Sequence, residues 1–247
     1  MSKKVYFLSD FHLGASYIAD RKEAERNITG FLDSIKDNAS EIYLMGDILD
    51  YWYEYKCVVP KGFVRFFGKL AELSDMGIKI HWFIGNHDIW IYDYLPSELG
   101  IEVIDGIQIK NILGKNFYLN HGDAVGKRDI SFRFIRRLFR NKVCQFFYSM
   151  LPSSLTIPFA HKWSSHSRAT EKKYSKEAIE NLTHFAKCYS EQQPDIDYYI
   201  FGHLHLIADE KVSHKARCII LGDWISRFSY AVFDGEELKI EHYTQPK

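Results

Sequence analysis

Short apolar runs alternate with stretches of helical periodicity along the first 125 residues of the chain. Residues 5–9, 41–45 and 79–84 are apolar runs of strand length. The apolar positions between these runs recur at helical spacing, first at Ala24, Ile28, Phe31, Leu32 and Ile35 and then at Phe63, Phe67 and Leu70. Strands that alternate with amphipathic helices are typical of βα units, in which the helices pack on a largely parallel sheet.

A second group of strands is predicted further along the chain. Residues 101–105, 108–112 and 116–120 are closely spaced strand-like segments, and the region 198–243 is again strand-rich, with an Asp-Gly turn at Asp234. Such a turn is typical of a hairpin. We therefore predict an α/β fold in which two facing mixed β-sheets are flanked by helices.

Residues 127–189 depart from the alternation of strands and helices, because they are helical in pattern and rich in aromatic and basic side chains. We predict that they form a helical lid inserted into a core of residues 1–126 and 190–247. The predicted helix has an apolar stripe of Ile135, Leu138, Phe139, Val143, Phe146, Phe147 and Met150, largely opposite Arg133, Arg136, Arg137 and Arg140. Two interpretations remain open: the helix lies among anionic headgroups of a membrane, or it packs its stripe on the core and leaves its arginines in water.

The composition excludes several classes of protein. With 247 residues, of which 46% are apolar, the chain is large enough to bury a real core. Its 32 basic and 32 acidic residues balance, which argues against a nucleic-acid partner. The four cysteines form no Cys-x-x-Cys pair, which argues against a disulfide framework and a thiolate zinc site. No apolar run reaches the roughly 18 residues of a membrane-spanning helix, and we expect no signal peptide before the first strand.

The first two predicted strands each end in a carboxylate motif. Asp10 and His12 stand in Ser-Asp-Phe-His-Leu, and two residues at this spacing in an extended segment point the same way, toward one ion. Asp47 stands in Gly-Asp-Ile-Leu-Asp, at the end of a strand where open α/β sheets place their ligand sites. Its two oxygens are able to bridge two ions. Each motif alone is also explained by an ordinary turn aspartate.

Three further motifs complete an ordered set. Gly-Asn-His-Asp carries Asn86, whose amide oxygen suits a metal ion, and His87, which is placed to reach a substrate or to serve as a structural histidine. His-Gly-Asp carries His121, and Gly-His-Leu-His carries His203 and His205. Taken together, five strand-end motifs with complementary chemistry indicate a site for two metal ions and a phosphoester hydrolase.

The ordered motifs resemble those of the calcineurin-like metallophosphoesterase superfamily, over residues 5–205. The resemblance implies that Asp47 bridges two divalent ions and that the remaining ligands divide between them. One ion would take Asp10, His12, Asp47 and His205, and the other Asp47, Asn86, His121 and His203. An oxygen and nitrogen ligand set permits manganese, iron or zinc, and the resemblance favours manganese. Such ions would activate a water for in-line attack on phosphorus, with His87 and Asp47 as catalytic residues.

Within the superfamily, the chain is most similar to the UDP-2,3-diacylglucosamine pyrophosphohydrolases of lipid A biosynthesis. Trp52 stands five residues after Asp47, Asp129 stands eight after His121, and Leu-Gly-Asp-Trp at 221–224 resembles that family's Leu-Gly-Ala-Trp. The lid lies where that family carries its own. Two departures are His87, where the best-known branch has arginine, and Leu204, where threonine is usual.

This resemblance implies a membrane-associated enzyme. The chain would cleave the pyrophosphate of UDP-2,3-diacylglucosamine, a lipid-linked nucleotide sugar, to UMP and 2,3-diacylglucosamine 1-phosphate, at the cytoplasmic face of the inner membrane. The candidate substrate contacts are Trp52, Arg128, Asp129, Phe132 and Ser165, and Asp50 or Asp88 is a candidate to orient a neighbouring histidine. Two alternatives remain: a soluble phosphodiesterase or phosphatase acting on a nucleotide or phosphoprotein, and a non-catalytic scaffold of the same fold.

Overall fold

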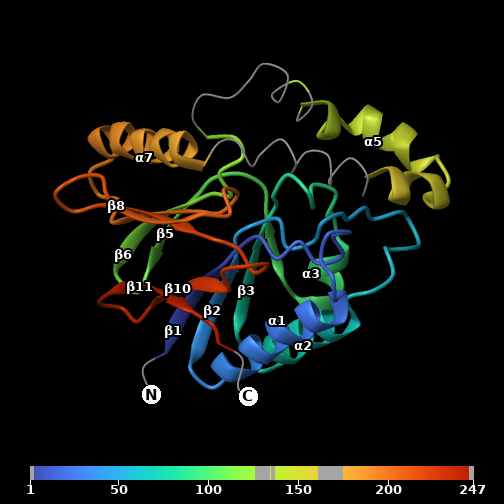
Figure 1. Ribbon diagram of the computed structural model, residues 1–247, viewed down its shortest axis with the longest axis horizontal. Coiled ribbons are helices and arrows are strands. Elements are labelled where there is room, and N and C mark those ends of the chain that lie inside the picture. The colour runs from blue at the N-terminus through green and yellow to red at the C-terminus, as the bar shows by residue number, and fades with distance from the viewer. Residues whose placement is uncertain (1–2, 126–133, 135–136, 161–174, 245–247) are drawn as a thin grey trace.

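The computed structural model describes residues 3–125, 134, 137–160 and 175–244 (Figure 1). The helices are α1 (Arg21–Ile35), α2 (Val64–Asp75), α3 (Tyr94–Leu99), α5 (Lys142–Ser149) and α7 (Ser175–Gln192). The strands in the first half are β1 (Lys4–Leu8), β2 (Ala39–Leu44), β3 (Lys79–Phe83), β4 (Glu102–Ile104), β5 (Gln108–Ile112) and β6 (Lys115–Leu119). Those in the second half are β7 (Tyr198–Phe201), β8 (Ile207–Lys211), β9 (Arg217–Leu221), β10 (Ser229–Phe233) and β11 (Leu238–His242).

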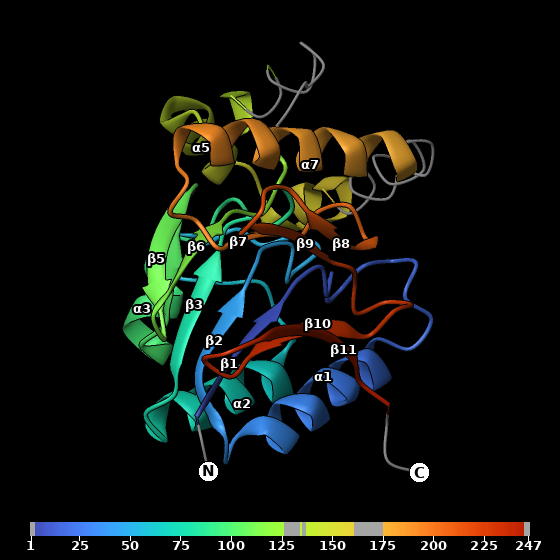
Figure 2. The ribbon, with the colours of Figure 1, turned by 90° about the vertical axis from the view of Figure 1, so that its left-hand side faces the viewer.

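Two mixed sheets face each other. The first has the order β11-β10-β1-β2-β3-β4, and the second has the order β5-β6-β7-β9-β8. In the first sheet β1 to β4 are parallel, and β10 joins β1 antiparallel. Figure 2 shows α1 and α2 below the first sheet and α7 above the second. The predicted α/β class and the two facing sheets are therefore confirmed.

The sequence of β1 explains these layers. Tyr6 and Leu8 pack with the helices α1 and α2, whereas Val5 and Phe7 pack between the two sheets, because successive side chains of a strand point to opposite faces. The ring of Phe7 stacks on Phe117 of the second sheet at 5.4 Å between ring centroids. A strand covered on both faces reads as a nearly continuous apolar run, as β1 does from Val5 to Leu8.

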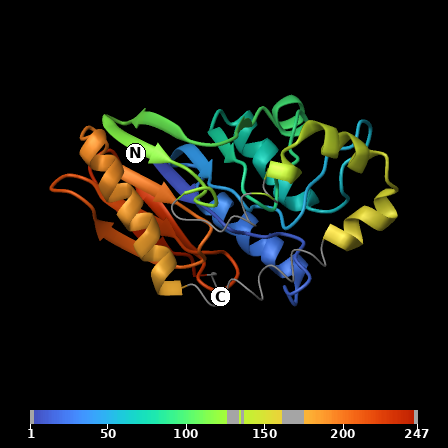
Figure 3. The ribbon, with the colours of Figure 1, turned by 90° about the horizontal axis from the view of Figure 1, so that it is seen from above.

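The predicted insertion contains two helical parts that lie on different sides of the molecule. Figure 3 shows α7 along the second sheet and α5 at the opposite side, beyond the end of the first sheet. The α7 helix packs Leu182 and Ala186 into the cluster that covers the second sheet. The division into a core and a lid at residues 127–189 stays a prediction. No described helix has the combination of length and apolar character that would let it cross a bilayer.

The lid differs from the single striped helix that was predicted. Asn141 interrupts it, and the Asn141 side chain accepts hydrogen bonds from the backbone N–H groups of Val143 and Cys144 to begin α5. Of the two open interpretations, packing of the stripe on the core does not describe four of its residues, Val143, Phe146, Phe147 and Met150, which are 62–67% exposed. Phe139 of the stripe packs on Trp90 of the body, and two residues off the stripe, Gln145 and Tyr148, also contact the body.

Candidate metal centre

The predicted metal ligands lie at the carboxyl ends of strands from both sheets. Five of them, Asp10, His12, Asp47, His203 and His205, have left-handed backbone conformations with φ between 46° and 68°. Residues other than glycine adopt this conformation at a cost of roughly 1 to 3 kcal/mol each, and such strain clusters at functional sites. The strained turns direct these side chains into one region between the sheet ends.

Glycines allow the strand ends to approach one another. A Cβ atom added to Gly85 would lie 2.1 Å from Oδ1 of Asp47, and one added to Gly202 would lie 2.8 Å from Oδ2 of Asp10. A Cβ atom on Gly46 would lie 2.5 Å from Nδ1 of His121. These glycines are therefore part of the site, because any larger residue would displace a predicted ligand.

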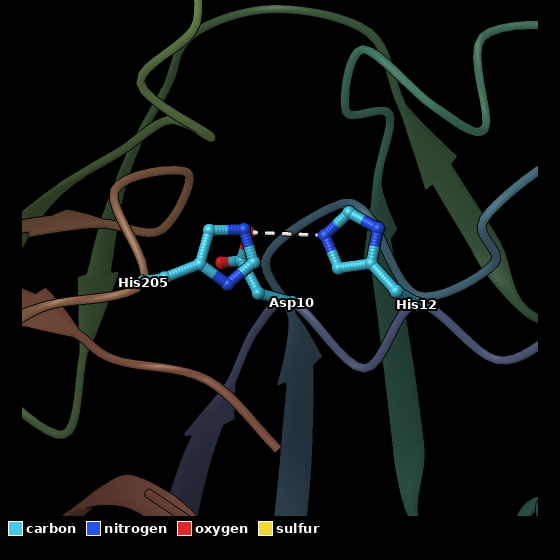
Figure 4. Close-up of side chains that lie close together, drawn as sticks. All are labelled: Asp10, His12 and His205. Carbon is cyan, nitrogen blue, oxygen red and sulfur yellow. Dashed lines mark ion pairs between the residues drawn. The ribbon is translucent and has the colours of Figure 1, made fainter. Parts of the chain in front are cut away.

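Asp10, His12 and His205 form the first group able to hold a metal ion (Figure 4). Figure 4 shows the two imidazole rings flanking the carboxylate. Oδ1 of Asp10 lies 3.6 Å from Nε2 of His12 and 3.3 Å from Nε2 of His205. Two ligand atoms on one ion, each about 2.1 Å from it, are about 3 to 3.5 Å apart, so the spacing suits a shared cation.

Asp47, His121 and His203 form the second group. Oδ2 of Asp47 lies 3.3 Å from Nε2 of His121 and 3.6 Å from Nε2 of His12, so this one oxygen faces both groups. The amide oxygen of Asn86 lies 3.3 Å from Nε2 of His121. The structure thus brings all seven predicted ligands together in the predicted division, and their binding of metal stays a prediction.

The electrostatics of this pocket also suit a cation. Burial raises the pKa of Asp47, but the charges of His121 and His87 outweigh it and hold that pKa well below its usual range. Burial lowers the pKa of His121, yet the charge of Asp47 and their hydrogen bond raise it to about 10. The buried carboxylates therefore require positive charge beside them, which protons on the imidazoles or a divalent ion supply.

The contacts of the Asp10 carboxylate test whether the site suits a metal ion. Its Oδ2 accepts hydrogen bonds from Oγ of Ser9 at 2.5 Å and from the backbone N–H of His203 at 2.9 Å. Its Oδ1 is buried and accepts no hydrogen bond from any residue that the structure describes. A buried carboxylate oxygen that faces two imidazoles is a suitable ligand for a metal ion.

Three carboxylates lie behind the ligands. Oδ1 of Asp50 lies 3.7 Å from Nδ1 of both His12 and His87, and its role in orienting a histidine stays a prediction. Asp88 instead accepts hydrogen bonds from backbone N–H groups and from Trp82, and burial followed by the charge of Asp47 raises its pKa to about 6. The third is Asp223, for which the sequence predicted no role at the site; its Oδ2 lies 3.6 Å from Nδ1 of His205.

Asp223 had a detectable signal in the sequence. It follows β9 directly as Gly-Asp, the same pattern that follows β2 at Asp47. Burial raises the pKa of Asp223, but the adjacent His205 ring and the hydrogen bond from the backbone N–H of Ser226 lower it to about 2. Asp223 is therefore an ionised, buried carboxylate next to a predicted ligand.

His87 lies close to both groups. It forms a third possible ligand set with His12 and Asp47. Its backbone N–H donates to Oδ1 of Asp47 at 2.8 Å, and its Nδ1 lies 3.2 Å from the carbonyl oxygen of Asp50. His87 is thus positioned either to meet a substrate at the centre or to bind an ion there.

Of the predicted substrate contacts, the structure describes Trp52 alone. Trp52 is fully buried, its ring packs against Phe67 and Tyr94, and its Nε1 donates to Glu54. A ring in this position reaches a ligand only if the core opens. Its packing in the core is enough to account for a tryptophan at this position, and its role as a substrate contact stays a prediction. The others, Arg128, Asp129, Phe132 and Ser165, lie outside the described residues.

An open cavity of about 440 Å³ lies between residues 140–145 of the predicted lid and residues 84–105 of the body. Apolar side chains of the body, including Ile84, Ile89 and Val103, line it together with Arg140 and Gln145 of the lid. Ile84 directly precedes the Gly-Asn-His-Asp motif in the sequence, whereas none of the seven predicted metal ligands lines this cavity. Tyr53 and Trp90 fasten the lid there by donating hydrogen bonds to the carbonyl oxygens of Gln145 and Phe139, both at 2.8 Å.

The close approach at Gly85 generates the first prediction. We expect Gly85→Ala to displace Asp47, and therefore to lower metal content and hydrolysis of an aryl phosphodiester by about 100-fold. Metal content after dialysis against Mn²⁺ and the initial rate of hydrolysis are the measurements. In the control, Gly68→Ala in α2, the added Cβ atom meets nothing within 4 Å and should raise stability by roughly 0.5 to 1 kcal/mol. Full metal content and activity in Gly85→Ala would contradict the steric argument.

Comparison with known proteins agrees with this geometry. A family model described as calcineurin-like phosphoesterase matches residues 3–206. A UDP-2,3-diacylglucosamine hydrolase of Porphyromonas gingivalis is 44% identical over 257 aligned residues, which cover 98% of both chains. A UDP-2,3-diacylglucosamine hydrolase of Histophilus somni is 26% identical, and the alignment covers 90% of this chain and 92% of that relative. Among solved structures, the phosphoesterase Yfce from E. coli aligns over 97% of this chain and 92% of its own, at 16% identity and a TM-score of 0.48. The resemblance predicted from the motifs is confirmed, and the chain belongs to the calcineurin-like phosphoesterase family.

Proposed function

We propose that this hydrolase cleaves the pyrophosphate of UDP-2,3-diacylglucosamine and releases UMP and 2,3-diacylglucosamine 1-phosphate. The observation that carries the proposal is the pair of ligand groups that meet at Oδ2 of Asp47. The substrate comes from the relatives, of which the one from P. gingivalis matches this chain over almost its whole length under the name UDP-2,3-diacylglucosamine hydrolase.

The residues of the site have separate tasks in this proposal. Asp10, His12, Asp47 and His205 would hold one divalent ion, and Asp47, Asn86, His121 and His203 the other. The ions, manganese in the first instance, would supply a water of lowered pKa and neutralise charge on the phosphoryl oxygens. His87 would donate a hydrogen bond or a proton to the phosphate group at the centre, a task suited to imidazole at neutral pH.

The cavity between lid and body supports a lipid substrate. Apolar side chains, Ile84, Ile89 and Val103 among them, line it together with Asp105, Arg140 and Lys142. Asp129 remains a candidate contact of the uridine side, and Arg128 a candidate contact of phosphate or of the membrane.

The outer surface of the lid supports association with the cytoplasmic face of the inner membrane. We call the exposed side chains of Val143, Phe146, Phe147, Met150, Leu151, Leu155 and Phe159 the lid apolar surface; they are 52–67% exposed. Exposed apolar residues that gather on neighbouring helices are typical of a surface that meets a membrane or a protein. The bilayer is the proposed occupant, because the proposed substrate lies in it.

The proposed reaction gives the second prediction. With Mn²⁺ in detergent, the wild type should release UMP from UDP-2,3-diacylglucosamine, and Asp47→Ala should lose the activity because both ligand groups lose a member. The control Glu98→Ala changes an exposed glutamate of α3 and should remain active. Cleavage of an aryl phosphodiester or of UDP-glucosamine, with no cleavage of the acylated substrate, would favour the soluble phosphodiesterase alternative. No hydrolysis of any of these phosphoesters would favour the scaffold.

A third prediction separates the two roles of His87. If His87 meets the substrate, His87→Gln should lower kcat by roughly 100- to 10,000-fold while two ions remain bound per chain. Elemental analysis of the dialysed protein and steady-state kinetics are the measurements, with His214→Gln, an exposed histidine, as the control. Loss of one bound ion in His87→Gln would identify His87 as a ligand instead.

The fourth prediction concerns the lid apolar surface. The double variant Phe146→Ser, Phe147→Ser should bind vesicles of phosphatidylethanolamine and phosphatidylglycerol at least about tenfold more weakly, because two large apolar side chains no longer enter the bilayer. Cosedimentation measures the binding, and hydrolysis of an aryl phosphodiester should be unchanged. The control Ile107→Ser, Ile109→Ser removes comparably exposed residues at the β5 edge. Equal loss of binding in both double variants would refute a specific role for the lid.

A further inference from the structure

Residues 223–227 form hydrogen bonds with the backbone of two predicted ligands of the first ion, Asp10 and His205. The segment follows β9, and the carboxylate of Asp223 organises it by accepting hydrogen bonds at Oδ1 from the backbone N–H groups of Ile225, Ser226 and Arg227. The backbone N–H of Trp224 donates to the carbonyl oxygen of Asp10 at 3.2 Å. Nε of Arg227 donates to the carbonyl oxygen of His205 at 2.7 Å. The segment therefore fixes the backbone at both ligands.

Asp223 also acts on the His205 ring. Its Oδ2 faces Nδ1 of the ring at 3.6 Å, while Nε2 on the other side of the ring faces Oδ1 of Asp10 at 3.3 Å. A carboxylate only accepts hydrogen bonds, so it favours the tautomer with a proton on Nδ1. That tautomer leaves the lone pair of Nε2 directed at the first ligand group, which is the state that a metal ion requires.

We propose that Asp223 is a positioning residue that selects the metal-binding tautomer of His205 and holds its ring toward Asp10. The inference rests on the proposed metal site and assigns a role to a residue that the metal ligands themselves do not include. It also accounts for the burial of an acidic residue only 5% exposed. Oδ1 accepts the backbone hydrogen bonds of the turn, the Ser226 hydroxyl donates to both oxygens, and Oδ2 also faces the His205 ring.

The variant Asp223→Asn tests the proposal, because it retains one oxygen for the turn and replaces the other with an amide N–H₂ group. An N–H₂ group facing Nδ1 favours the opposite tautomer, with the proton on Nε2. Titration calorimetry with Mn²⁺ should show one of two sites weakened by about 10- to 100-fold and the other unchanged. The control Asp209→Asn removes the ion pair of an exposed carboxylate with Arg217 and should bind both ions normally.

Nuclear magnetic resonance of the metal-free protein gives a readout independent of activity. At a pH at which His205 carries a single proton, long-range ¹H–¹⁵N correlations should show a larger share of the tautomer with the proton on Nδ1 in the wild type than in Asp223→Asn, because Asp10 faces Nε2 in both proteins. An equal share in both proteins, or Asp223→Asn with two ions at wild-type affinity, would overturn the proposal. If the wild type binds two ions but does not cleave the acylated substrate, the proposed substrate fails and the role of Asp223 stands.

Discussion

The buried negative charge at the meeting point of the two sheets is the constraint on which the rest of the structure depends. Asp10 and Asp47 are almost completely inaccessible to water, and two carboxylates in such a place are stable only with positive charge beside them. Imidazoles from three other motifs surround them, and the pKa of His121 rises to about 10 because of Asp47. The sheets, the glycines and the turns can all be understood as the means of gathering these groups.

The strained backbone of these turns lowers the stability of the fold, and contacts with the surrounding structure offset this loss. Asp10, His12 and Asp47 have left-handed conformations in consecutive loops of one sheet, and hydrogen bonds between these loops, from Asp10 to Gly46 and from His12 to Asp47, hold them there. Such strain persists only where neighbouring contacts determine the backbone. A more relaxed loop would be more stable and would point its ligand elsewhere, so stability and function oppose each other at these positions.

Local patterns predicted most of the core and the ligand set, because a polar residue directly after an apolar run is visible in the sequence alone. Asp47 after β2 and His121 after β6 are of this kind. Features that depend on packing between distant segments were not predictable: the burial of Trp52 against α2, the outward direction of Phe146 and the contact of Asp223 with His205. The lid stripe showed this limit most clearly, since helical spacing identifies an apolar face but not what covers it.

The first ligand group joins parts of the chain that are far apart in sequence. Asp10 and His12 come from the first sheet, whereas His205 comes from the second, almost 200 residues later. An ion bound there would cross-link the two sheets, so free energy of binding would become free energy of folding. Newly made chains would then mature by capturing metal, and a cell short of that metal would lose the protein itself to degradation as well as its activity.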